Sequence, residues 1–145
     1  MKIEKAVKAE HQKLIEIWES SVRATHNFLA ERDLIKLKPL ILDQYFDAVD
    51  LSVARNCEGE IVGFCGVSNS NIEMLFVAPQ AIGKGVGSLL AWHAIHVQGA
   101  TKVDVNEQNK QALGFYKHLG FDVIGRSNLD GQGNPYPILH MCLSI

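Results

Sequence analysis

The stretch APQAIGKGVGSLLAWHAIHV, residues 78–97, carries Gly83, Gly85 and Gly87 at alternate positions, directly before an amphipathic helical pattern. The β-rich run IEMLFVA, residues 72–78, precedes the glycines. A strand, a glycine turn and a helix start together form an anion site. The first N–H groups of a helix lack partners, and glycine lets a phosphate approach the backbone closely. A tight turn without a ligand is the alternative, but three glycines at a helix start favour a ligand.

The glycine spacing fits neither of two common nucleotide-binding motifs completely. A P-loop requires G-x-x-x-x-G-K-[ST], but Ala78 stands at its first glycine and Gly85 follows Lys84. A dinucleotide-binding turn requires G-x-G-x-x-G, but Ser88 stands at its third glycine. Asp104 lies at a suitable distance for a ribose-binding acid, so a dinucleotide-dependent oxidoreductase remains an alternative.

Outward from this stretch, the hydrophobic period alternates between that of strands and that of helices. Strands are expected at 2–7, 51–55, 60–67, 72–78, 101–105, 121–126 and 138–145, and helices at 10–25, within 34–49, at 86–97 and at 112–119. Pro39 predicts that the main helix of 34–49 starts near it, because proline suits a first helical turn. The order is β-α-α-β-β-β-α-β-α-β-β, which predicts an α/β (α+β) fold: a mixed sheet of six to seven strands with helices on both faces.

Composition bounds the function. The 145 residues carry a net charge of −2 and no basic stripe, so we expect one domain over 1–145 and no nucleic-acid partner. No apolar run approaches membrane-spanning length, and the opening MKIEKAV has no signal-peptide core, so we expect a cytoplasmic protein that does not bind membranes. The three cysteines lack metal-ligand spacing, so we expect no metal.

Two motifs carry a resemblance to a known family. The turn resembles the [QR]-x-x-G-x-G/A pyrophosphate motif of the GNAT superfamily of acetyl-CoA-dependent N-acetyltransferases. Residues 80–85 match it literally. Residues 82–87 match its glycines and align the helix start, with Ile82 at the usual Gln or Arg, and we prefer this frame.

The second motif, NEQNKQALGFYKHLGF at 106–121, is similar to the N-x-x-A-x-x-F-Y-x-x-x-G-F pattern of the same family. Both motifs occur in the family's order, and the topology matches over essentially the full chain. The resemblance therefore implies the GNAT fold, with a mostly antiparallel sheet, and N-acetyltransferase activity.

The resemblance implies that acetyl-CoA is the acetyl donor. A backbone N–H near Phe76 would bind its thioester carbonyl, and a splay between strands 72–78 and 101–105 would admit it. The implied cofactor-binding residues are Leu75, Phe76, Val77, Ile82, Gly83, Lys84, Gly85, Val86, Gly87, Ser88, Asn106, Asn109 and Tyr116. Asn106 can equally make the turn, and Asn109 can cap the following helix.

The resemblance also implies direct transfer in a ternary complex, with Tyr116 as general acid to the CoA thiolate. From residue spacing alone, Tyr116 is a core tyrosine. The general base stays open between Glu73, His26 and water. Glu73 can also be a solvated strand residue, and His26 can also bind substrate or cap a helix.

The resemblance implies that the acceptor is a primary amine of a small molecule, an amino acid or a peptide or protein. The implied substrate-binding residues are Trp18, Val22, His26, Phe28 and Tyr136, although Trp18 and Val22 at i, i+4 also suit a plain core. A monomer and a homodimer are both open. A catalytically idle acetyl-CoA-binding module is the second alternative.

Overall fold

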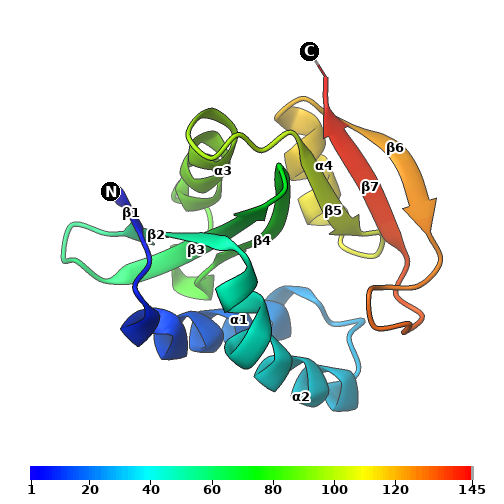
Figure 1. Cartoon of the computed structure of the whole chain (residues 1–145), viewed down its shortest axis with the longest axis horizontal. Helices are drawn as coiled ribbons and strands as arrows, with labels where there is room; N and C mark the ends of the chain where they lie inside the picture. Colours follow the sequence, from blue (N-terminus) through cyan, green and yellow to red (C-terminus); the bar gives the residue numbers. More distant parts are fainter. Residues whose placement is uncertain (145) are drawn as a thin grey trace.

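The computed structural model describes residues 1–144 and contains one seven-stranded sheet (Figure 1). The elements in chain order are β1 (Lys2–Lys5), η1 (Lys8–Glu10), α1 (His11–Thr25), α2 (Glu31–Leu40), η2 (Ile41–Tyr45), η3 (Phe46–Ala48), β2 (Asp50–Arg55), β3 (Ile61–Ser68), β4 (Asn71–Val77), η4 (Pro79–Ala81), α3 (Val86–His96), β5 (Lys102–Asn106), α4 (Lys110–His118), β6 (Phe121–Ser127) and β7 (Ile138–Leu143). This order confirms the expected succession of strands and helices. Ile145, the last residue of the expected final strand, lies outside the described residues.

The sheet is mostly antiparallel, with the strand order β1-β2-β3-β4-β5-β7-β6. Only β4 and β5 run parallel, and among the described residues they pair only at Asn71 with Lys102 and Ile72 with Val103. Beyond these pairs the strands diverge, which confirms the expected splay.

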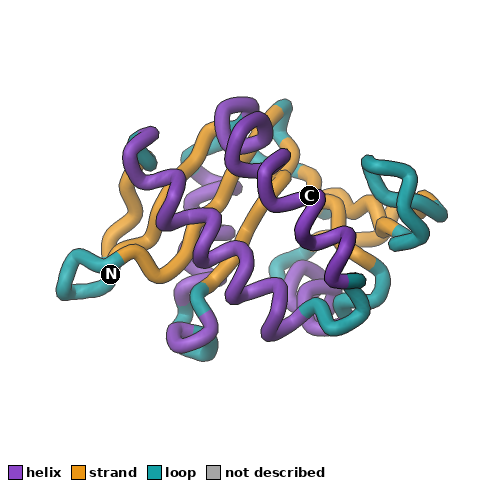
Figure 2. Tube along the Cα trace, turned by 90° about the horizontal axis from the view of Figure 1, so that it is seen from below, coloured by secondary structure: helices purple, strands orange, loops and turns teal. Residues whose placement is uncertain are grey.

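Helices cover both faces of the sheet. The core under α1 and α2 includes Leu14 and Phe64, and the core under α3 and α4 includes Cys65 and Leu90. Phe64 and Cys65 are neighbours on β3, so their side chains point to opposite faces. Figure 1 shows α1 and α2 on one side of the sheet and α3 on the other, and Figure 2 shows the α1–α2 side from below.

A bulge in β4 exposes Glu73 to the splay. Val67 pairs with Ile72 and Gly66 pairs with Met74, so Glu73 has no partner on β3. Ile72 belongs to the core under α3, whereas Met74 belongs to the core under α1. Residues i and i+2 of a strand normally point to the same face, so the inserted residue, Glu73, reverses the face to which Met74 points.

The expected start of the second helix near Pro39 is wrong. The helix α2 begins at Glu31, and Pro39 lies inside its last turn. The missing N–H of Pro39 removes the bond to the carbonyl of Ile35, whose side chain is exposed, so water can solvate that carbonyl. The chain then continues through the wider π turn η2, where the helix accommodates the irregularity.

None of the helices over residues 1–144 is both long and apolar enough to cross a membrane.

Candidate functional site

A cleft of about 380 Å³ opens where β4 and β5 diverge. The described residues that line it are Ser21, Thr25, His26, Ile72, Glu73, Met74, Leu75, Phe76, Val77, Ala81, Ile82, Gly83, Gly85, Val86, Gly87, Ser88, Val103, Asp104, Val105, Asn106, Asn109, Gln111, Ala112, Phe115 and Tyr116. Most residues expected to bind acetyl-CoA are therefore gathered in one cleft, together with the three candidate catalytic residues.

The glycine turn forms one end of this cleft. Gly83 and Gly85 both have φ of +83°, a backbone conformation that side chains rarely adopt. Apart from the glycine itself and its two neighbours in the chain, no atom lies within 4 Å of where a Cβ of either residue would be. Gly85 is the N-cap of α3, and the first intrahelical bond runs from the N–H of Leu89 to its carbonyl. The N–H groups before Leu89 are thus available to a ligand, and the open backbone fits a pyrophosphate.

Tyr116 lies on α4 and reaches the cleft from the α3 side of the sheet. Only 6% of the residue is exposed, and the rings of Phe115 and Phe121 pack edge-on against its ring. This burial raises the pKa of the phenol above its usual range, so the hydroxyl keeps its proton at neutral pH.

Asn109 joins the two sides of the cleft. Its Oδ1 caps α4 by accepting from the N–H of Ala112 at 3.1 Å, so its Nδ2 is the atom that faces Nε2 of His26 at 3.3 Å. The amide donates to Nε2, which therefore carries no proton. The other ring nitrogen, Nδ1, lies 2.7 Å from Oγ1 of Thr25. The proton sits on Nδ1 and is donated to Thr25, whose hydroxyl donates to the carbonyl of Ser21.

The network leaves His26 neutral. Burial lowers the pKa of the imidazole, because the charged form loses its hydration. The single free electron pair of the neutral ring, on Nε2, already accepts from Asn109. His26 is thus partly buried, and both of its ring nitrogens are hydrogen-bonded at the C-terminal end of α1.

Two further polar residues line the cleft from its strands. Glu73 projects from the bulge of β4 and is exposed. Asn106 ends β5, and its Oδ1 accepts from the N–H of Gln108 at 3.1 Å. Asn106 therefore makes the turn after β5, which was one of its two interpretations, and it also lines the cleft.

Five predicted residues do not line the cleft among the described residues. Trp18 and Val22 are buried in the core under α1, which fits their alternative interpretation. Lys84 lines a second, smaller cavity with Lys13 and Glu60. Phe28 and Tyr136 lie beside the cleft, because the ring of Phe28 is 5.2 Å from His26 and 6.3 Å from Tyr136.

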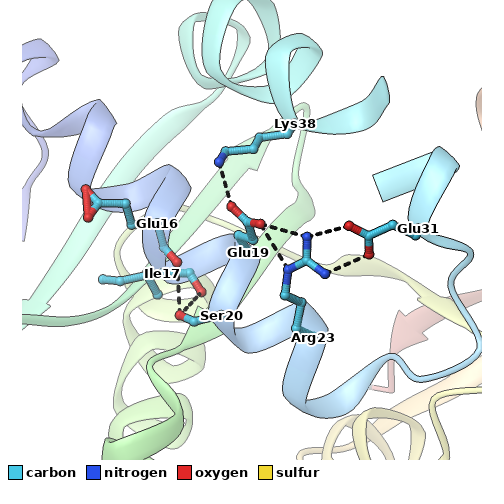
Figure 3. A network of polar contacts seen from close by, with 7 residues as sticks. All are labelled: Glu16, Ile17, Glu19, Ser20, Arg23, Glu31 and Lys38. Carbon is cyan, nitrogen blue, oxygen red and sulfur yellow. Dashed lines mark hydrogen bonds and ion pairs between the residues drawn. The ribbon is translucent and has the colours of Figure 1, made fainter. Parts of the chain in front are cut away.

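Two polar links brace the segments that carry Phe28 and Tyr136. The hydroxyl of Tyr136 donates to Asp33 at 2.5 Å and accepts from the N–H of Ala30 at 3.0 Å, which ties the β6–β7 loop to α2. Figure 3 shows the second link, in which Glu19 of α1 accepts from Lys38 of α2, and Arg23 bridges Glu19 and Glu31. These two sets of hydrogen bonds fix the segment between α1 and α2, which follows His26, against α1 and against the β6–β7 loop.

Sequence reasoning missed three polar residues of the cleft, Ser21, Thr25 and Gln111, and considered Asp104 only as a ribose-binding acid. The strand pattern offered a signal for Asp104, since it stands between two apolar valines in KVDVN. Ser21 offered another, as a polar residue within the apolar stripe of its helix.

The thiol of Cys65 is not available as a nucleophile. Burial in β3, with a smaller contribution from Asp50, raises the pKa of the Cys65 thiol to about 12, so it stays protonated. Over residues 1–144 no group of three or more metal-ligating side chains is placed to hold an ion.

The dinucleotide alternative does not fit the observed topology. The glycine turn follows β4, the last strand of the antiparallel β2–β3–β4 meander, and the β4–α3–β5 unit does not continue into a parallel sheet, because β5 pairs antiparallel with β7.

Comparison with known proteins agrees with this geometry. A model described as an acetyltransferase (GNAT) domain matches residues 47–123, which span both motifs. The peptidyl-lysine N-acetyltransferase YjaB of Salmonella typhimurium is 42% identical over 132 residues, which cover 91% of this chain and 90% of that protein.

Solved structures agree as well. The solution structure of apo-form YjaB from Escherichia coli has a TM-score of 0.86 at 39% identity and covers 97% of this chain and 95% of its own. The PaiA N-acetyltransferase of Thermoplasma acidophilum in complex with coenzyme A has a TM-score of 0.73 at 18% identity over 99% of this chain and all (100%) of that chain, which shows the shared fold. The chain therefore belongs to the GNAT family and is an N-acetyltransferase.

Proposed function

We propose that this enzyme transfers the acetyl group of acetyl-CoA directly to a primary amine, with the lysine side chain of a peptide or protein as acceptor. One observation carries the proposal: a single cleft contains the glycine turn, the unpaired edge of β4 and the buried phenol of Tyr116. The lysine acceptor is supported by a relative, 42% identical, that is named a peptidyl-lysine N-acetyltransferase.

The glycine turn and β4 would hold the donor. The free N–H groups between Gly83 and Leu89 would bind the pyrophosphate, since a helix N-terminus favours negative charge. Past Ile72 the edge of β4 has no pairing with β5, so Leu75, Phe76 and Val77 can bind the pantetheine and the thioester carbonyl through their backbone. Acetyl-CoA supplies an activated acetyl group and a thiolate leaving group.

Tyr116 would act as the general acid. Its buried phenol holds a proton at neutral pH and faces the cleft where the strands diverge. A positioned acid of this kind gives its proton to the departing sulfur, which avoids releasing a free thiolate into an apolar site.

Glu73 would be the base, acting directly or through water. Its carboxylate is exposed to the cleft, and the bulge leaves it free of a strand partner. His26 is less suited to this role, because its unprotonated Nε2 already accepts from Asn109. We assign His26 to positioning, between the acceptor side on α1 and the donor side on α4, with Phe28 and Tyr136 shaping the acceptor entrance.

Two titrations and one assay test this proposal. Calorimetry should show micromolar binding of acetyl-CoA and no binding of NADH. Release of CoA thiol should then increase with a blocked lysine peptide more than with free amino acids. Absence of acetyl-CoA binding would refute the proposal, whereas binding without turnover of any amine would favour an idle binding module.

A further inference from the structure

The register of the sheet places Asp104 on the face that α1 and α2 leave open. Val103 and Val105 are buried in the core under α3 and α4, so Asp104 between them points to the other face. The core under α1 and α2 draws its strand residues from β2, β3 and β4. The β5–β7–β6 part of this face therefore lies beside the cleft, and Asp104 belongs to both.

The charged side chains that line the cleft are negative. Among the described residues that line it, Glu73 and Asp104 are the charged side chains, and neither Lys nor Arg is present. Both carboxylates lie on the adjacent strands β4 and β5, whereas the anion site on the glycine turn is built from backbone N–H groups. One region of the cleft therefore favours a cation and the other an anion.

His140 holds the Asp104 carboxylate in place, and Ser127 holds the ring of His140. His140 stands directly opposite Asp104 on β7, and its Nδ1 lies 2.7 Å from Oδ1. The other ring nitrogen, Nε2, lies 2.7 Å from Oγ of Ser127 on β6. Gly125 completes the row on β6, and the space beside the ring is kept open because glycine has no side chain there. One carboxylate oxygen of Asp104 is thus anchored and the other remains available.

We infer that Asp104 is a specificity residue that binds the positively charged amine of the acceptor, and that His140 positions it. This inference rests on the proposed function, because it concerns the acceptor of that reaction. A lysine side chain brings a lone cation to the carboxylates, whereas the α-amine of a free amino acid also brings its own carboxylate, which they repel. Asp104 binds the ammonium form, and Glu73 takes the proton before attack.

Acceptor kinetics of Asp104→Asn at saturating acetyl-CoA test the inference. The KM for a blocked lysine peptide should rise about three- to fivefold, the range of a partly exposed ion pair, with kcat little changed. The rise should shrink at high salt. Asp122→Asn is the matched control, because Asp122 lies on the same open face, two strands away, and does not line the cleft. An unchanged KM in Asp104→Asn, or an equal rise in both variants, overturns the inference.

His140 is tested by truncation and by rescue. His140→Ala should raise the same KM, because the carboxylate loses its donor. His140→Asn should restore most of it, since an amide N–H can replace the Nδ1 donor. Equal KM values for the two variants would show that His140 does not position Asp104.

A binding measurement separates this inference from the proposed function. In NMR titrations, n-butylammonium should shift the resonances of Asp104 and the His140 ring, and n-butanol should not. These shifts require no turnover, so they remain a test if the protein acetylates no lysine. Equal shifts with both probes, or shifts that persist in Asp104→Asn, would overturn the cation site.

Discussion

The two ends of the cleft present different parts of the protein: backbone N–H groups at the glycine turn, and the carboxylates of Glu73 and Asp104 at the proposed acceptor end. At the glycine turn the backbone would face the ligand, and the positive φ values belong to Gly83 and Gly85 within one short loop. At the proposed acceptor end side chains would face the ligand, and they come from α1, β4, β5 and α4. The hydrogen bond between His26 and Asn109, for example, joins residues that are 83 positions apart in the chain.

The backbone site and the side-chain site should tolerate substitution differently. A backbone site is damaged by adding a side chain, whereas a side-chain site is damaged by removing one. Substitutions at the glycine turn should therefore abolish binding of acetyl-CoA altogether, whereas substitutions at the acceptor end should weaken acceptor binding in graded steps.

Gly85→Asp should produce the largest effect. Its carboxylate would stand against the pyrophosphate at the start of α3, and affinity for acetyl-CoA should fall about 100-fold or more. Calorimetry measures this loss. Gly99→Asp is the control, because Gly99 also has positive φ, +73°, with nothing near its Cβ position, and lies outside the cleft. Both variants carry a backbone strain of about 1 kcal/mol, so a similar affinity in both would contradict a donor site at Gly85.

Tyr116→Phe should lower kcat about 100-fold or more while acetyl-CoA affinity stays near that of the wild type. The ring and its packing against Phe115 and Phe121 are kept, and only the proton donor is lost. Turnover by thiol release and affinity by calorimetry separate the two effects. Tyr45→Phe removes a hydroxyl that accepts from Gln132, remote from the cleft lining, and should leave kcat unchanged. Normal turnover in Tyr116→Phe would exclude it as the acid.

The same contrast explains which features could be predicted from sequence. The glycine turn, α3 and α4 were readable because local spacing determines them: the turn residues, the i, i+3, i+4 pattern and the cap at Asn109 lie within a few residues of one another. The splay between strands 72–78 and 101–105 followed from the family resemblance and was confirmed by the short pairing of β4 with β5.

The acceptor end depends on contacts that no local pattern encodes. Trp18 and Val22 share a helical stripe with Ser21, and only packing shows that the first two enter the core while Ser21 lines the cleft. His140 carried no motif, and its bond to Asp104 exists because β7 inserts between β5 and β6. The helix start predicted near Pro39 was wrong because a proline is also compatible with the last turn of a helix when a π turn follows.

Glu73→Gln should reduce kcat/KM at neutral pH about 100-fold, because the amide cannot take the amine proton. His26→Gln should reduce it less, since a glutamine amide can still bond with Asn109 and the base would remain. The two variants form a direct comparison by thiol release with a lysine peptide. A larger loss in His26→Gln would reverse the assignment of base and positioning residue.

The smallest effect concerns stability rather than turnover, and it arises from the burial of His26. Burial lowers the pKa of this imidazole below its unfolded value, so at mildly acidic pH the unfolded chain binds a proton that the folded chain does not. The free energy of unfolding should therefore fall as pH decreases through the unfolded pKa of His, near 6.5. Urea midpoints at about pH 7.5 and about pH 5.5 measure this fall. Carboxylates with pKa values lowered by ion pairs, such as Glu10 and Glu19, titrate below this window. The fall should be smaller in His26→Gln and unchanged in His118→Gln, whose imidazole is exposed on α4. An equal fall in wild type and His26→Gln would show that the imidazole is not held neutral, and the bond from Asn109 would then not decide its protonation.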